Sequence, residues 1–291
     1  IYKERIELGR RLTHRVMEAS GGNFDHTVFS FIPNTAEISY MGLVQGAEDL
    51  LNELKAKAII GLGKSPKEKD VMDIMMQRPR VEKIAWKDIK LRTFIAEDTG
   101  RDDMVAHVYD STYNLVGPQD SLVAVDDSIV RGTTLRKSIL GMLDKLGPKR
   151  IIIVSSAPQI RYPDCYGIDM ARMKDFAAFQ AVVSLLKKRK LDQVLPEAYE
   201  LAKSELNKPK EKQINAVKAV YKHFSADEIS HEIAVILTPK HVKAEVKIIY
   251  QRIGGVRNRW WVYPGQGHLK VYGIFGYGDG EPFVFSLGNG V

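Results

Sequence analysis

Cysteine is nearly absent from the 291-residue sequence, in which Cys165 is the only one. A single cysteine excludes an internal disulfide framework and favours a reducing compartment, so we expect a cytoplasmic protein. Apolar runs are short as well: none approaches the roughly 18 residues that a transmembrane helix needs, and the first residues are charged rather than signal-like. The histidines show no paired ligand spacing. We therefore expect no disulfide scaffold, no membrane association and no structural metal bound by histidines.

Positive charge is present in excess. The sequence contains 43 lysines and arginines against 36 aspartates and glutamates, which gives a net charge of +7 and a pI of about 9.2. This balance favours anionic partners, but charge alone leaves small anions and nucleic acids both open. The length allows a full hydrophobic core in one large domain or two smaller ones.

Strand and helix patterns alternate in the first part of the chain. Residues 3–18 form an amphipathic helical pattern that two glycines, Gly21 and Gly22, close. A strand pattern at Thr27–Ile32 and a helical pattern at about 37–57 follow. Residues 64–82 are charged and rich in methionine, which favours a solvated loop with a short helix over a binding element. Further strands are predicted at Leu122–Val125 and Arg150–Ser155. The segments Lys90–Ile95 and Met104–Tyr109 are predicted to be two short strands, or a strand and a lid. This alternation predicts an α/β protein with a parallel sheet flanked by helices.

The pattern changes beyond about residue 173. Four helical patterns follow one another, at Lys174–Lys190, Pro196–Leu206, Glu211–Phe224 and Ala226–Leu237, and Pro239 is expected to open a further helix. Ser225 and Glu228 form a capping box for the fourth helix. Residues 254–291 are rich in glycine and aromatic residues and are typical of β-hairpins. We therefore predict three parts: a domain at 1–173, a helical extension at 174–253 and a β-like tail of unknown role at 254–291.

Two adjacent carboxylates follow the most apolar strand pattern of the chain. In Ser121–Leu140, SLVAVDDSIVRGTTLRKSIL, the run Leu122–Val125 is typical of a strand buried on both faces of a parallel sheet. Asp126 and Asp127 come directly after it, at the strand end where open α/β sheets bind their ligands. Taken alone, such a pair is also compatible with a surface turn or a helix cap.

A loop of small and hydroxyl residues follows the acid pair. Gly132 permits a tight turn or a close backbone approach, and the pattern becomes helical from Thr133. The free N–H groups and the dipole at a helix N-terminus favour an anion. The sequence therefore predicts that residues 128–134 bind a phosphate group.

Three strings carry a resemblance to a known family. VAVDDSIVRGTT resembles the phosphoribosyl pyrophosphate (PRPP) motif of type I phosphoribosyltransferases. RTFIAED at Arg92–Asp98, VDDSIVRGTT at Val125–Thr134 and SSAPQIRYPDCYGIDM at Ser155–Met170 together resemble the amidophosphoribosyltransferases (glutamine PRPP amidotransferases) within that family. The resemblance runs in the same order from about residue 1 to about residue 170, and the opening YKERIELGRRL is similar to the start of their synthase half. It implies a type I phosphoribosyltransferase-like parallel sheet.

The resemblance also implies roles for individual residues. Asp126 and Asp127 would accept hydrogen bonds from the ribose hydroxyls, would favour the positive charge that develops on the ring, and would meet Mg²⁺ mainly through the substrate. Arg92 joins these two acids in the implied catalytic set. The residues implied to bind the ribose 5-phosphate are Ser128, Val130, Arg131, Gly132, Thr133 and Thr134. The implied pyrophosphate loop consists of Pro33, Asn34 and Thr35.

The sequence departs from the family in three places. Glutamine hydrolysis in the family depends on a cysteine at the mature N-terminus, where this chain has Ile1. Asn34 stands where the family has an acid, and about twenty extra residues intervene before RTFI. The segment corresponding to the catalytic lid reads GRDDMVAHVYDSTYN, in which Arg101 is the only arginine or lysine, so weaker pyrophosphate binding is expected. A glutaminase domain is expected N-terminal to this segment in a longer chain, or free ammonia is used instead.

Three functions are compatible with these observations. The first is the transfer of ammonia to C1 of PRPP, which gives 5-phosphoribosylamine and pyrophosphate, the entry step of purine synthesis. The second is a regulatory module on the same fold that binds PRPP or a nucleotide without turnover. The third, nucleic-acid binding through the basic surface, is the least favoured. We expect a homo-oligomer, and purine nucleotides are candidate inhibitors.

Overall fold

The computed structural model describes residues 1–33, 35–87, 109–111, 114–163, 172–209 and 212–252. The chain divides into two compact units. The first comprises Ile1–Asp127, Thr133–Ser156 and Thr238–Ile249, and the second comprises Ser128–Gly132 and Ala157–Leu237 together with the described residues from Tyr250 onward. Each unit is described by itself. No helix in the described ranges is both long enough and apolar enough to cross a membrane.

The first unit is built around a five-stranded sheet with the strand order β2-β1-β5-β6-β7. Its strands are β1 (Thr27–Phe31), β2 (Arg80–Val81), β5 (Ser121–Asp126), β6 (Arg150–Ser155) and β7 (Glu245–Tyr250). The pairs β1–β2, β1–β5 and β5–β6 are parallel. This confirms the predicted α/β class with a parallel sheet flanked by helices.

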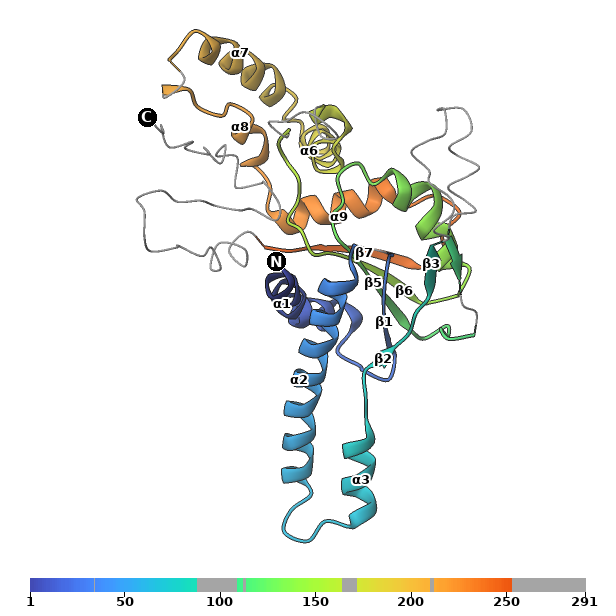
Figure 1. The fold of residues 1–291 in the computed structure, drawn as a ribbon. Coiled ribbons are helices and arrows are strands. Elements are labelled where there is room, and N and C mark those ends of the chain that lie inside the picture. Colours follow the sequence, from blue (N-terminus) through green and yellow to red (C-terminus); the bar gives the residue numbers. More distant parts are fainter. Residues whose placement is uncertain (34, 88–108, 112–113, 164–171, 210–211, 253–291) are drawn as a thin grey trace. The chain divides into compact units, whose positions relative to one another are not determined.

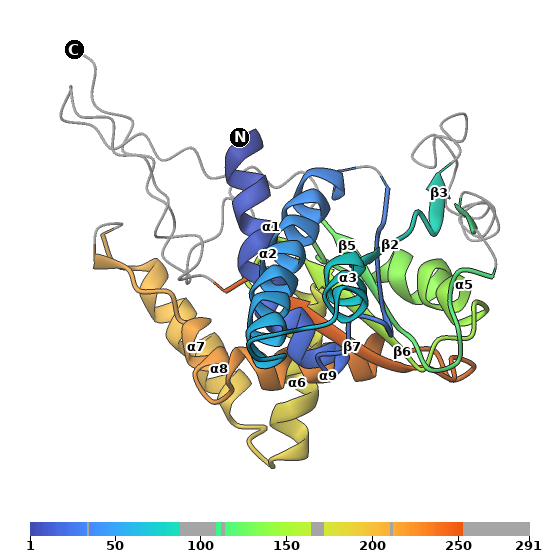
Figure 2. The ribbon, with the colours of Figure 1, turned by 90° about the horizontal axis from the view of Figure 1, so that it is seen from below.

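Two long helices, α1 (Tyr2–Ser20) and α2 (Glu37–Gly61), pack against one face of this sheet and against each other (Figures 1 and 2). Successive strand residues point to opposite faces, so alternate positions meet the helices. The buried cluster on that face contains side chains from four strands: Phe29, Phe31, Val123, Val125, Ile152, Val154 and Ile249. The helix predicted at 3–18 is confirmed, and Gly21 ends it with the left-handed φ of 95° that its predicted capping role requires.

The α1–α2 contact is unusually close because glycines line it. A methyl group added at Gly9 would lie 1.9 Å from the Ser39 backbone oxygen, and one added at Gly42 would lie 1.9 Å from the Ile6 backbone oxygen. Neither distance is compatible with a side chain, so the two backbones touch without intervening side chains. Toward its C-terminus, α2 is accompanied by α3 (Glu68–Met76), a helix with no buried residue (Figure 1). This confirms the short solvated helix predicted within 64–82.

A two-stranded antiparallel sheet completes the described part of the first unit. It consists of β3 (Ala85–Lys87) and β4 (Tyr109–Ser111). The strand predicted at Lys90–Ile95 and most of the one predicted at Met104–Tyr109 lie outside the described residues.

The second unit contains four α-helices in its described ranges: α6 (Ala177–Lys188), α7 (Val194–Leu206), α8 (Lys218–Tyr221) and α9 (Ala226–Leu237). The predicted capping box is confirmed, since Ser225 Oγ accepts from the Glu228 N–H at 3.1 Å and Glu228 accepts from the Ser225 N–H at 2.8 Å. The helix predicted at Glu211–Phe224 is much shorter than expected.

The helix expected to open at Pro239 is wrong. The chain instead forms β7, which joins the sheet of the first unit beside β6. The segment EVKIIY is rich in β-branched residues, whose restricted side chains favour a strand. The description of 174–253 as helical therefore fails at Glu245–Tyr250, while the division of the chain at residues 173 and 253 stays a prediction.

A buried acid, Asp120, connects segments at the amino ends of the strands in the first unit. Asp120 is 4% exposed and accepts hydrogen bonds from Arg80 Nη1 at 2.9 Å, the Gly117 N–H at 2.8 Å and His26 Nδ1 at 3.1 Å. Burial alone would raise the pKa of Asp120, but these hydrogen bonds and the Arg80 charge outweigh it and lower the pKa below its usual value.

We expect Asp120→Asn to lower the free energy of unfolding by about 1 to 3 kcal/mol near neutral pH. Because the folded pKa is depressed, this contribution is present above the unfolded pKa and is lost as the pH falls through the folded value. Urea unfolding of both proteins over a pH series measures the difference. A difference that stayed constant through the acid range would contradict the assignment.

Candidate functional site

The two predicted acids lie where the sequence placed them, at the carboxyl end of β5. Asp126 is the last residue of the strand and pairs with Ser155 of β6. The Ser156 N–H donates to the Asp126 backbone oxygen at 3.0 Å, and Ser156 Oγ donates to the Asp127 backbone oxygen at 3.2 Å. The chain after β6 therefore fixes the backbone of both acids.

The carboxyl group of Asp126 is held in an electrostatically unfavourable position. Its Oδ1 accepts the Asp127 N–H at 2.9 Å. Burial, followed by the charge of Asp127, nevertheless raises the pKa of Asp126 to about 8. The protonated form of Asp126 is therefore favoured compared with that of an ordinary aspartate. A ligand that supplies positive charge or hydroxyl donors would favour its ionised form, and such a mismatch is typical of binding and catalytic carboxylates.

The predicted pyrophosphate loop begins at the same edge of the sheet. Phe31, the last residue of β1, pairs with Val125 of β5, and the Ile32 N–H donates to the Val125 oxygen at 2.8 Å. Pro33 and Thr35 follow before α2 begins at Glu37. Because β1 and β5 are parallel neighbours, the structure brings this loop and the acid pair to one edge. Asn34 lies outside the described residues.

The predicted phosphate loop has the backbone that its sequence indicated. Gly132 has a φ of +70°, which side-chain-bearing residues rarely adopt. Ser128 and Val130 are partly buried, whereas Arg131, Thr133 and Thr134 are exposed. Helical structure begins at Thr133, as predicted, and continues through a π-helical stretch, Leu135–Ile139, into α5 (Leu140–Asp144). Arg92, the lid segment up to residue 108 and Cys165 lie outside the described residues.

The donor set at the acid pair suits a magnesium ion that is held largely by its substrate. Among the described residues, no group of three or more His, Cys, Asp or Glu side chains could hold a metal ion. Two adjacent carboxylates are nevertheless a sufficient protein contribution, since Mg²⁺ commonly binds one or two carboxylates together with substrate phosphates. Asp126 and Asp127 therefore fit the predicted role.

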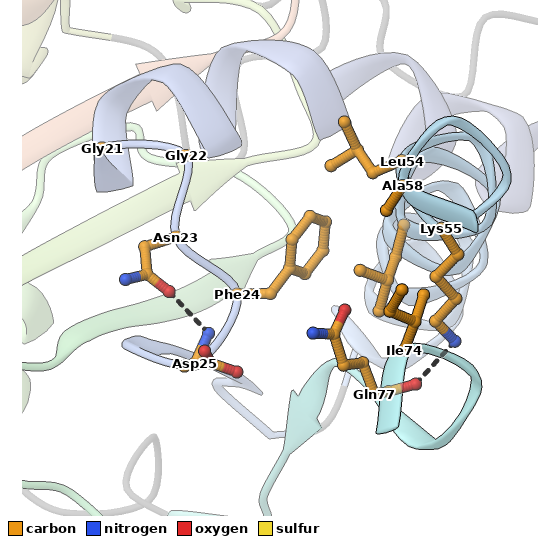
Figure 3. Close-up of a pocket in the computed structure, with 11 residues that line it drawn as sticks. Gly21, Gly22, Asn23, Phe24, Asp25, Leu54, Lys55, Ala58, Ile74 and Gln77 are labelled. Carbon is orange, nitrogen blue, oxygen red and sulfur yellow. Dashed lines mark hydrogen bonds between the residues drawn. The ribbon is translucent and has the colours of Figure 1, made fainter. Parts of the chain in front are cut away.

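A cavity of about 370 Å³ lies at the opposite edge of the same unit (Figure 3). It is lined by Gly21–Asp25, which precede β1, and by residues of α2 and α3 such as Leu54 and Ile74. Lys55 Nζ donates to the Met75 and Gln77 backbone oxygens, at 3.3 and 2.6 Å, and so joins α2 to the C-terminal end of α3. The cavity therefore lies at the amino end of β1, whereas the acid pair lies at the carboxyl end of β5. Because these neighbouring strands are parallel, the cavity is remote from the acid pair.

Comparisons with known proteins agree with the strings in the sequence. No family model matches the chain. The amidophosphoribosyltransferase of Schizosaccharomyces pombe is 29% identical over 187 residues, which cover 62% of this chain and 28% of that protein. The Methanocaldococcus jannaschii enzyme is 39% identical over 87 residues (30% and 18%), and the Pasteurella multocida enzyme 48% over 59 residues (20% and 12%). Over these stretches the chain is similar in sequence to amidophosphoribosyltransferases.

A search of solved structures also found a similar protein. The glutamine PRPP amidotransferase of Bacillus subtilis, complexed with ADP and GMP, aligns with a TM-score of 0.44 at 19% identity, over 88% of this chain and 36% of that one. The chain spans only part of the length of these proteins: its match covers 28% of the Schizosaccharomyces pombe relative.

Proposed function

We propose that this chain is the synthase domain of an amidophosphoribosyltransferase, which transfers ammonia to C1 of PRPP. The observation that carries the proposal is the acid pair at the carboxyl end of β5, beside the loop that follows β1, with the pKa of Asp126 raised to about 8. The sequence similarity to amidophosphoribosyltransferases supports it.

The proposed reaction breaks the bond between C1 and the pyrophosphate oxygen and forms a bond between C1 and ammonia. The electron pair of the broken bond leaves with pyrophosphate, and the new amine loses a proton. Asp126 and Asp127 hold the ribose hydroxyls, and their negative charge stabilises the cationic ring as the leaving group departs. Mg²⁺, when bound, neutralises charge on the pyrophosphate. The loop from Ser128 to Thr134 anchors the 5-phosphate and thereby orients C1.

The proposal extends to the setting of the protein. We expect a cytoplasmic enzyme that acts with a glutaminase domain N-terminal to this segment, or on free ammonia, and that forms homo-oligomers. Purine nucleotides are candidate inhibitors of the proposed enzyme.

A second function is favoured by one departure in the sequence. The lid segment GRDDMVAHVYDSTYN retains a single cation, Arg101. Fewer cations weaken the binding of a pyrophosphate group, since each contributes attraction to its charge. The alternative is therefore a module that binds PRPP or a nucleotide without turnover.

Pyrophosphate release distinguishes the two functions. We would incubate this chain with PRPP and Mg²⁺, with and without ammonium at mildly alkaline pH, and measure released pyrophosphate. Release that depends on ammonium is the expected result. PRPP binding by calorimetry without release would favour the binding module, and absence of both would overturn the proposal.

A further inference from the structure

The predicted phosphate loop is held by helices that follow it far along the chain. Residues Ser128–Gly132 belong to the same compact unit as α6 and α9, not to the unit that contains the sheet. The Ala177 N–H, in the first residue of α6, donates to the Val130 backbone oxygen at 2.8 Å. This is one of the free N–H groups of a helix N-terminus, used here to fix a loop.

The last residue of α9, Leu237, packs against the loop at Gly132. A methyl group added at Gly132 would lie 2.4 Å from Leu237 Cδ1 and 2.7 Å from its Cδ2. Leu237 is the last residue of α9 and is only 3% exposed. The left-handed backbone at Gly132 therefore packs directly under a buried side chain.

The two helices are themselves locked together. Glu232 of α9 is 3% exposed and accepts hydrogen bonds from Ser184 Oγ at 2.6 Å and from Lys188 Nζ at 2.6 and 2.7 Å, both in α6. Burial opposes ionisation of Glu232, but these bonds outweigh it and lower its pKa. The contacts at Val130 and Gly132 thus come from one connected pair of helices.

We propose that α6 and α9 position the phosphate loop, with the Ala177 N–H and the Leu237 side chain as the positioning groups. The inference rests on the proposed function and assigns the support of its 5-phosphate loop to helices outside the PRPP motif. In this proposal both groups act on the loop and not on the substrate. No local pattern in the sequence indicates this role, because both contacts join segments about 50 or more residues apart.

Ala177→Pro tests the hydrogen bond. Ala177 occupies the first position of α6, where proline is well tolerated, and the preceding Phe176 has the extended φ of −75° and ψ of 130° that a following proline requires. The substitution removes the N–H, and the ring carbon in its place cannot remain as close to the Val130 oxygen. Glu68→Pro is the matched control: it is the first residue of α3 and follows Lys67 with a φ of −71° and ψ of 138°.

Leu237→Ala tests the packing contact independently, in case the proline variant fails to fold. Its control is Ile233→Ala, which truncates a fully buried side chain one turn earlier in the same helix. Both truncations cost stability, but Leu237 supplies the three atoms nearest to a methyl group added at Gly132.

The readouts are binding of ribose 5-phosphate by calorimetry, KM for PRPP against kcat, and hydrogen exchange of the loop amides. We expect Ala177→Pro and Leu237→Ala to weaken ribose 5-phosphate binding roughly tenfold to a hundredfold, to raise KM more than they lower kcat, and to speed exchange at 129–132. The controls should stay within about threefold.

The outcomes separate the two proposals. If the unaltered chain binds PRPP and releases pyrophosphate while both test variants match their controls in every readout, the positioning role is overturned and the proposed function stands. If the unaltered chain neither binds nor turns over PRPP, the proposed function fails; accelerated loop exchange in the test variants alone would then support the contacts, and unchanged exchange would overturn them.

Discussion

Asp126→Asn combined with Asp127→Asn is expected to lower PRPP turnover by about a factor of a thousand or more, while the chain stays folded. Both carboxylates are lost, so the ribose hydroxyls lose charge-assisted acceptors and the cationic ring loses its counter-charge. Pyrophosphate release with saturating ammonium measures the loss. Full activity in the double variant would show that the acids do not contact the reacting sugar.

The Asp126 carboxyl group is expected to lower the free energy of unfolding. The folded pKa of Asp126 is about 8, well above its ordinary value of 3.8. Ionisation therefore opposes folding progressively as the pH rises from the unfolded pKa to the folded one. Asp126→Asn alone should raise the free energy of unfolding near neutral pH by at least about 1 kcal/mol, and the gain should shrink toward pH 4.

A matched substitution separates site from scaffold. Asp144 accepts the N–H groups of Lys243 and Ala244 at 2.9 and 2.8 Å, away from the acid pair along the chain. Asp144→Asn should lower stability modestly and leave turnover per folded molecule within about twofold. An Asp126→Asn variant that was destabilised like Asp144→Asn would contradict the electrostatic assignment.

Gly42→Ala is expected to destabilise the first unit by about 3 kcal/mol. The added methyl group would lie 1.9 Å from the Ile6 backbone oxygen, and 2.7 Å from its carbonyl carbon, so α1 and α2 must separate. Separation exposes part of the apolar cluster that both helices share with the sheet. Urea unfolding followed by circular dichroism measures the change.

Gly61 provides the control within the same helix. It is the last residue of α2, and a methyl group added there meets nothing within 4 Å. Gly61→Ala should therefore leave stability unchanged or raise it by about 0.5 to 1 kcal/mol, because alanine loses less backbone freedom on folding. Equal effects of the two substitutions would show that the α1–α2 backbone contact is absent in solution.

Local signals predicted the elements that position the acid pair. The apolar run Leu122–Val125 identified β5, and the glycine at position 132 identified the left-handed turn, because each depends on properties of adjacent residues. Charge and hydrophobic period also identified α1, α2 and α9. The raised pKa of Asp126 follows from burial and from the neighbouring charge of Asp127. The sequence showed the adjacent acid, but it did not predict that the Asp126 carboxyl group is buried.

Contacts between distant segments were not predictable from the sequence. The β7 segment was interpreted as helical because Pro239 is a common helix start, whereas pairing with β6 decided its conformation. The contacts of Ala177 and Leu237 with the loop depend on the packing of α6 and α9, and no residue pattern near the motif encodes that packing. The position of the acid pair at the carboxyl end of β5 was thus predictable from the sequence, whereas the contacts of α6 and α9 with the phosphate loop were not.

The late return of β7 to the sheet has a consequence for synthesis. Arg150 forms an ion pair with Glu245, and the Glu245 N–H donates to the Lys149 oxygen. More than ninety residues separate these two positions in the sequence. Until the ribosome has synthesised the chain as far as β7, β6 has an unpaired edge with the apolar sequence RIIIVS. Contacts of such sequence separation form slowly. The nascent chain is therefore most prone to aggregation while β6 awaits its partner, and a ribosome stalled between the two strands would expose this edge longest.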